Sequence, residues 1–118
     1  MAETTWYDAR GAATAYIAED GTTVYTWKGK AVAYLVDGDK LYSWRGRHLG
    51  WYVDGIVYDG RAKRVGFTDE TSPVPVAEEP VKPAPAKKPA RAARSAARPR
   101  PTLTIGKSEY ALSAFLMS

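Results

Sequence analysis

His48 is the one histidine among 118 residues, and the chain contains no cysteine. It lies between Arg47 and Leu49, with no serine motif nearby. A catalytic histidine needs an orienting carboxylate and a substrate pocket, and the sequence identifies neither of them. We therefore expect His48 to have a structural or surface role.

Three Asp-Gly pairs, at 20–21, 37–38 and 54–55, are the nearest approach to a calcium motif. An EF-hand loop needs alternating acidic residues and a glutamate at its twelfth position, which none of them has. The glycines form no phosphate-binding loop, and thiolate metal sites are excluded because cysteine is absent. The sequence predicts that the protein is not an enzyme and has no catalytic residue, cofactor or metal.

Basic residues stand beside aromatic residues at several points, as in Trp27-Lys28 and Trp44-Arg45. Exposed pairs of this kind stack nucleic-acid bases or hold lipid head groups, whereas buried ones only pack a core, and both interpretations are open. A basic residue also recurs at intervals of 18, 17 and 16 residues. These residues are the candidates for a positive rim: Arg10, Lys28, Arg45 and Arg61.

The basic character of the chain, +4 in total, belongs to its second part. Residues 72–118 have eight basic and three acidic residues, a net charge of +5, and residues 1–71 have a net charge of −1. No acidic residue lies between Glu79 and Glu109. Such a segment suits a nucleic-acid backbone or an anionic membrane surface, and the alternative is a solvated linker. The candidate anion-binding residues are Lys82, Lys87, Lys88, Arg91, Arg94, Arg98 and Arg100.

An internal repeat organises residues 1–71. A tyrosine is followed four residues later by glycine, or by Ala62 in the last copy, in the segments 7–11, 25–29, 42–46 and 58–62. The stretches between these turns are rich in β-branched and aromatic residues, which favours strands. Asp-Gly pairs link one copy to the next, and Asp59-Gly60 is expected to move the fourth turn earlier. The pattern predicts four β-hairpins with about eight short antiparallel strands.

Closure of these hairpins around a pseudo-fourfold axis removes the open sheet edges, so we predict an all-β closed ring. The rival fold is a small barrel of the SH3 or oligonucleotide-binding type, which has no fourfold repeat. One small residue recurs in each copy, followed by an aromatic residue, and we expect it near the axis. These axial residues are Ala15, Ala33, Gly50 and Gly66. By simple alternation, the preceding residues share the opposite face with the aromatics: Thr14, Val32, Leu49 and Val65.

The segments AYLVDGDKLY (33–42) and GRHLGW (46–51) resemble the bacterial four-fold β-flower proteins. The likeness covers residues 5–71, and members of that family similarly carry a Pro/Lys/Arg-rich extension. The resemblance implies hairpins arranged around a largely hydrophobic central channel, and it implies no established activity. The basic run Arg61-Ala-Lys-Arg64 departs from the acidic and aromatic residues usual in the last repeat.

Three regions follow from this pattern. Residues 1–71 form the ring, residues 72–101 are expected to be a disordered linker, and residues 102–118 form a short apolar segment. That segment is expected to begin a helix near Ser108, which docks on the ring, binds a partner or stays unfolded. No stretch has the length of a membrane-spanning helix or the pattern of a signal peptide, so we expect a cytoplasmic protein.

Three functions are compatible with the sequence. The first is a binding module, a rigid ring whose cationic arm engages nucleic acid or an anionic lipid surface. The second is binding of a small apolar ligand or lipid in an axial channel. The third is a protein–protein adaptor whose C-terminal segment carries the binding motif.

Overall fold

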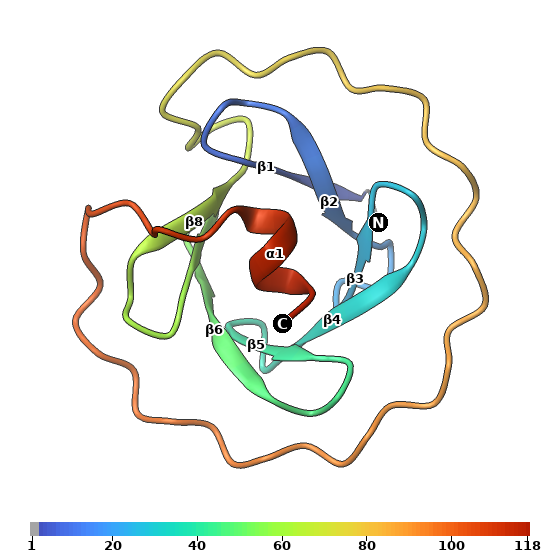
Figure 1. The fold of residues 1–118 in the computed structure, drawn as a ribbon, viewed down its shortest axis with the longest axis vertical. Helices are drawn as coiled ribbons and strands as arrows, with labels where there is room; N and C mark the ends of the chain where they lie inside the picture. Colours follow the sequence, from blue (N-terminus) through green and yellow to red (C-terminus); the bar gives the residue numbers. More distant parts are fainter. Residues whose placement is uncertain (1–2) are drawn as a thin grey trace.

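The computed structural model describes residues 3–118. Eight antiparallel strands form a closed barrel in chain order, and one short helix, α1 (Leu112–Leu116), lies in the middle of the ring (Figure 1). The strands are β1 (Thr4–Tyr7), β2 (Ala13–Ile17), β3 (Thr23–Thr26), β4 (Ala31–Val36), β5 (Lys40–Ser43), β6 (His48–Val53), β7 (Ile56–Tyr58) and β8 (Arg64–Phe67). The predicted closure of four sequential hairpins is confirmed. We call these hairpins petals one to four.

The four petals end in the same turn. Its first residue has a side-chain oxygen that accepts the backbone N–H four residues on, which fixes the turn locally. These first residues are Asp8, Thr26, Ser43 and Asp59. The fourth residue has a left-handed backbone, at Gly11, Gly29 and Gly46, and Ala62 adopts the same conformation with φ 62°. The expected early shift of the fourth turn at Asp59-Gly60 is therefore wrong.

Each petal has a β-bulge, which in petals two to four turns an additional side chain toward the core. Pairing between the two strands skips one residue at the same place in each petal, namely Thr14, Val32, Leu49 and Val65. Alternation placed these residues on the face opposite the small positions, and this is wrong for Val32, Leu49 and Val65, which share the central core cluster with Ala15 and Ala33. The aromatic residues that follow the small positions form the outer wall.

The four small residues all lie in the interior, for different reasons. Ala15 and Ala33 belong to the core cluster. A Cβ on Gly50 would lie 2.0 Å from the carbonyl oxygen of Tyr58, so the adjacent strand leaves no room for a side chain there. A Cβ on Gly66 would lie 2.9 Å from Leu112, so this glycine makes space for α1.

The apolar C-terminal segment docks into the ring, which was one of its three possible fates. Leu112, Phe115 and Leu116 are buried in the same core cluster as the inward side chains of the strands. The helix was expected to begin near Ser108, but it begins at Leu112, so Tyr110 precedes α1 and is 52% exposed. The implied central channel is therefore filled by α1 at the rim of the petal turns. Across residues 3–118, the structure contains no helix with the length and hydropathy needed to span a membrane.

Residues 72–108, which we call the belt, run around the outside of the ring (yellow to orange in Figure 1). Composition predicts disorder for residues 72–101, whereas the structure gives them an extended course with a contact at every petal. Four belt amides, each nine residues after the last, donate to the carbonyl of the left-handed turn residue at 2.8–3.2 Å. The pairs are Ala77 to Gly11, Ala86 to Gly29, Ser95 to Gly46 and Thr104 to Ala62.

Nine residues match the size of the ring. The molecule measures 37 × 35 Å across. A quarter of the perimeter of such a disc is about 28 Å, which is the length of nine residues at ~3.1 Å each in a polyproline II conformation. The belt therefore passes each petal in the same register.

Candidate functional site

Aromatic clusters on the outer wall of the ring, which we call shelves, lie beneath the belt. In the first, Tyr16 stacks on Tyr25 with ring centroids 5.5 Å apart and meets Trp27 edge-on at 5.9 Å. Tyr34, Tyr42 and Trp44 repeat this arrangement one copy later. The belt covers both shelves, so these aromatics are neither freely exposed nor part of the central core.

Belt cations lie over the shelves. The Lys82 ammonium is 3.7 Å from the centroid of the Tyr16 ring and pairs with Glu3. The Arg91 guanidinium carbon is 4.2 Å from the centroid of Tyr34, and that of Arg94 is 5.7 Å from Tyr42. Cations over aromatic faces are stabilised by the ring quadrupole, by about 0.5–1 kcal/mol at exposed sites. These contacts hold the basic residues against the ring rather than on a free arm.

The seven candidate anion-binding residues fall into two groups. Five have partners on the ring: Lys82, Arg91 and Arg94 as above, Lys88 near Asp20 at 3.9 Å, and Arg98 on His48. Within residues 3–118, the side chains of Lys87 and Arg100 make no hydrogen bond, ion pair or cation–π contact. Both are exposed.

The four candidate rim residues occupy the third position of each petal turn. All are exposed, and the petals carry them to four corners of the ring: Arg10, Lys28, Arg45 and Arg61. The structure therefore gives each petal an outward cation at this position of the turn. That these residues bind an anion remains a prediction.

Acidic groups gather where β1 meets β8. A cavity of about 410 Å³ there is lined by Glu3, Asp69, Glu70 and Glu79. The Tyr7 hydroxyl donates to Glu79 at 3.0 Å. Burial, and then this bond to a carboxylate, raises the pKa of Tyr7 to about 12. The perimeter thus has an acidic arc at the closing seam, and the basic arc follows along the rest of the belt.

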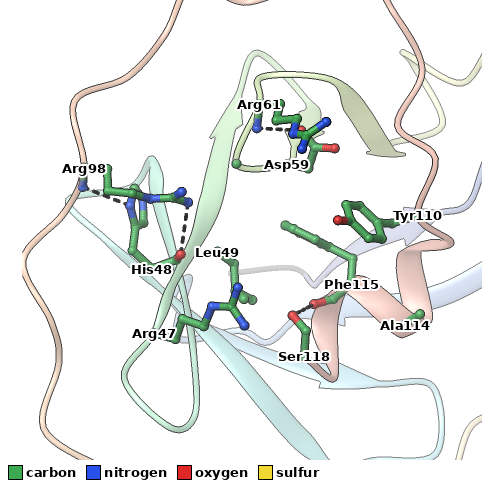
Figure 2. Close-up of a pocket in the computed structure, with 11 residues that line it drawn as sticks. Arg47, His48, Leu49, Asp59, Arg61, Arg98, Tyr110, Ala114, Phe115 and Ser118 are labelled. Atoms are coloured by element: carbon green, nitrogen blue, oxygen red, sulfur yellow. Dashed lines mark hydrogen bonds between the residues drawn. The ribbon is translucent and has the colours of Figure 1, made fainter.

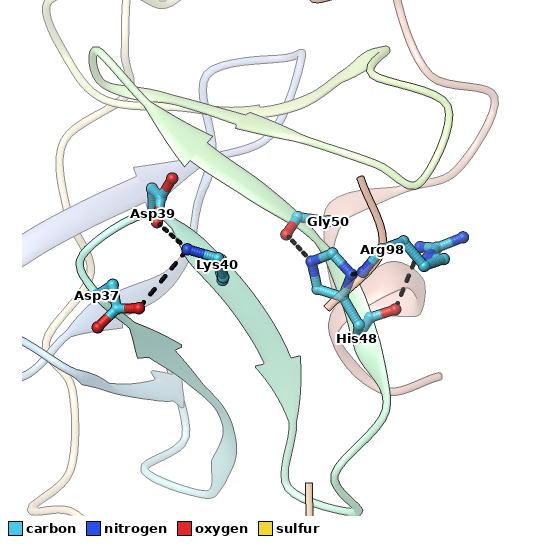
Figure 3. Close-up of polar contacts among 6 residues, drawn as sticks. All are labelled: Asp37, Asp39, Lys40, His48, Gly50 and Arg98. Carbon is cyan, nitrogen blue, oxygen red and sulfur yellow. Dashed lines mark hydrogen bonds and ion pairs between the residues drawn. The ribbon is translucent and has the colours of Figure 1, made fainter. Parts of the chain in front are cut away.

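His48 joins the belt to petal three (Figure 3). Its Nε2 is 3.0 Å from the Gly50 carbonyl oxygen, and its Nδ1 accepts the Arg98 backbone N–H at 3.1 Å. Nε2 must carry the hydrogen, since a carbonyl only accepts, so the ring is neutral. Burial lowers the pKa of His48, and the nearby Arg98 and Lys40 lower it further. This is the structural role expected of His48. Among the described residues, no group of three metal-ligating side chains occurs.

Sequence reasoning missed the register of the belt, although a signal was present. Lys82, Arg91 and Arg100 are nine residues apart, as are Pro80 and Pro89. This spacing is hard to recognise in the sequence, because the segment is rich in Pro, Ala, Lys and Arg and contains no aromatic residue that would stand out at each interval. The signal becomes interpretable only when the ring supplies four equivalent anchor points.

The chain matches the model of a protein family. A family model described as "4-fold beta flower protein" matches residues 4–116. The match extends beyond the 5–71 span of the resemblance and takes in the belt and α1. Neither the curated proteins nor the solved structures contain a match. A family model that covers nearly the whole chain shows that the chain belongs to the 4-fold beta flower family.

Proposed function

We propose that this protein is a non-enzymatic binding module that engages the phosphate backbone of nucleic acid through the cations of its belt. The observation that carries the proposal is the continuous basic arc. Eight basic residues and no acidic residue lie between Glu79 and Glu109, and the belt presents them around most of the perimeter.

Several belt cations keep their N–H groups available to a ligand, because acidic groups of the ring do not neutralise them. Within residues 3–118, Arg91 and Arg94 contact rings but donate no side-chain hydrogen bond, so their N–H groups remain available to phosphates. Lys87 and Arg100 are free of partners in the same residues. A belt already ordered on the ring also avoids part of the entropy cost of ordering a disordered arm on binding.

The other two functions have less support. An axial ligand would compete with α1, whose three buried apolar side chains belong to the core. An adaptor that uses the C-terminal segment would have to expose the same side chains. Both require the docked helix to leave its site, whereas Lys87, Arg91, Arg94 and Arg100 can reach a ligand without any rearrangement of the core.

The test is binding of a fluorescent mixed-sequence DNA duplex and a single-stranded RNA across a salt series. Each neutralised phosphate contributes about −0.9 to the log–log salt slope on B-DNA. We expect Lys87→Gln/Arg100→Gln to make the slope shallower by about 1.8, because both side chains lack a partner that folding needs. Lys40→Gln is the matched control, since Lys40 pairs with Asp37 and Asp39 away from the belt.

Failure takes two forms. No binding of either nucleic acid at low salt would overturn the proposal. Salt-dependent binding to vesicles that contain anionic lipid, without binding to DNA or RNA, would assign the belt to a membrane surface instead.

A further inference from the structure

The interval between petals three and four breaks the repeat in a coordinated way. The residue after the first position of the petal turn is Trp27 in copy two and Trp44 in copy three, but Gly60 in copy four. The belt changes at the corresponding place, from Pro80 and Pro89 to Arg98, again in nine-residue register. The petal turn and the belt segment facing it therefore both differ from the repeat at this one interval.

The two regular intervals show what the missing tryptophan does. Its indole Nε1 donates to the belt carbonyl, from Trp27 to Pro80 at 3.1 Å and from Trp44 to Pro89 at 3.0 Å. At the irregular interval, a Cβ on Gly60 would lie 2.8 Å from an Arg98 guanidinium nitrogen, so arginine stands where the indole would begin. Arg98 also donates to the His48 carbonyl at 3.2 Å, which fixes its guanidinium at the wall.

This replacement opens a cavity of about 580 Å³ (Figure 2). The equivalent space between petals two and three, which Trp44 lines, measures about 100 Å³. The larger cavity is lined by Arg47, Leu49, Arg61, Arg98, Tyr110 and Phe115, among others. Ring, belt and C-terminal segment all contribute, so the cavity exists only in the fully docked molecule.

The charges of the lining are unbalanced. Within residues 3–118, the guanidinium groups of Arg47 and Arg61 form no hydrogen bond or ion pair. Asp59 also lines the cavity, but its carboxylate accepts the backbone N–H groups of Arg61 and Lys63 and the Ser108 hydroxyl at 2.6–3.0 Å. Asp59 is 2% exposed and its carboxylate is already bonded within the turn. The guanidinium groups of Arg47 and Arg61 therefore have no free carboxylate side chain to pair with among the described residues that line the cavity.

Apolar side chains lie between the two arginines. Figure 2 shows Arg61 and Arg47 on opposite sides of the cavity, with Phe115 and Tyr110 side by side between them and Leu49 next to Arg47. A ligand with an anionic group at either arginine could place an aromatic or aliphatic body against these side chains. Sites of 300–1,000 Å³ with apolar walls and a few convergent polar groups are typical of small-molecule binding.

We propose that the cavity between petals three and four binds a small organic anion, with its carboxylate or phosphate held by one of the two lining arginines, Arg47 or Arg61, and its apolar body packed on Phe115 and Tyr110. Arg98 forms the back wall and positions the belt. Arg98 is the belt cation that lines this site, and the other belt cations lie outside it, so the proposal does not depend on nucleic-acid binding.

The experiment uses 2-naphthoate and 1-naphthyl phosphate as probes, followed by ¹⁵N chemical-shift perturbation on the full chain. We expect shifts centred on Gly60, Arg98 and Phe115. The neutral analogue 2-naphthol is expected to bind about tenfold more weakly or worse, since it cannot form charge-assisted hydrogen bonds. The two probes distinguish carboxylate from phosphate recognition.

Two test variants and one control variant locate the site. Gly60→Trp combined with Arg98→Pro rebuilds the interval in the form that the ring already accepts twice, and it is expected to abolish binding. Ala9→Trp adds the same side chain at the equivalent exposed position of copy one and should leave binding unchanged. Arg47→Gln/Arg61→Gln removes the cations without filling the space and is expected to weaken 2-naphthoate binding about tenfold or more. Shifts that are absent, that lie elsewhere, or that survive in both the rebuilt and the arginine-free variants would overturn the proposal.

Discussion

His48 holds the belt only in its neutral form. Its Nδ1 accepts the Arg98 N–H, and a proton on that nitrogen would face another donor. Burial lowers the pKa of His48 in the docked state, while the ring has its ordinary value near 6.5 once released. The released state therefore takes up the proton first as the pH falls, so the contact is stable above about pH 6.5 and weakens below it.

We expect protection of the Arg98 amide from hydrogen exchange to fall between about pH 7.5 and pH 5, after correction for the intrinsic exchange rate. His48→Ala reproduces the residue at the equivalent position of copy two, Ala31, and should remove this pH dependence. The same dependence in the variant would assign the effect to another group. Asp20 does not interfere, because hydrogen bonds to its carboxylate bring its pKa to about 2, below this range, against the opposing effect of burial.

Two features of the position of Gly46 disfavour a side chain there: a left-handed backbone and a close contact with the belt. Its φ is 86°, and a Cβ would lie 2.1 Å from the Ala93 carbonyl oxygen of the belt. Gly46→Ala is expected to cost about 1–2 kcal/mol for the left-handed backbone and more for displacement of the belt. Urea unfolding measures the total.

Ala62 provides the comparison, since it already has φ 62° in the equivalent turn. Ala62→Gly should change stability by less than about 1 kcal/mol, because relief of backbone strain and the added freedom of the unfolded chain oppose each other. A loss in Gly46→Ala no larger than about 1 kcal/mol would mean that the belt does not press on this turn.

At the scale of elements, α1 is part of the core although it lies at the end of the chain. Leu112 is 1% exposed and packs over Gly66. Leu112→Ala is expected to cost about 2–5 kcal/mol, the range for a large core residue. Ser113→Ala on the exposed side of the same helix should cost less than about 0.5 kcal/mol. Denaturant unfolding with equal losses in both variants, or with none in Leu112→Ala, would contradict the assignment of α1 to the core.

Local patterns predicted the strands and turns, and contacts distant in sequence determined the rest. The hairpins follow from turn residues and strand composition within each copy of 16–18 residues. The bulges at Val32, Leu49 and Val65 were missed, since alternation assumes regular pairing and nothing local marks the extra residue. Docking of α1 at Gly66 could not be predicted, because it depends on a partner more than 40 residues away.

At the scale of the whole molecule, the belt and α1 complete a ring that closes weakly. β1 and β8 share the one residue pair Tyr7 and Phe67, whereas every other pair of adjacent strands has three or four. The acidic arc, the start of the belt and Glu79 all lie at this seam. The composition that suggests a disordered arm therefore belongs to a segment that holds the closed ring together.

This arrangement predicts an exchange pattern that a disordered linker cannot produce. The belt has no sheet or helix of its own, so most of its amides face water, but those that donate to the petal turns do not. We expect hydrogen exchange at intermediate pH to show protected amides at nine-residue intervals, at Ala77, Ala86, Ser95 and Thr104. Ala92 and Arg98 are also expected to be protected, by their bonds to Trp44 and His48, with faster exchange at the other amides between the anchors. Ser95→Pro removes the N–H of the third anchor and should lower protection of Arg98 more than that of Ala77, since Arg98 lies three residues from the lost bond. Fast exchange at all four amides would show that the belt does not stay on the ring in solution, and the nine-residue register would then have no role in stability.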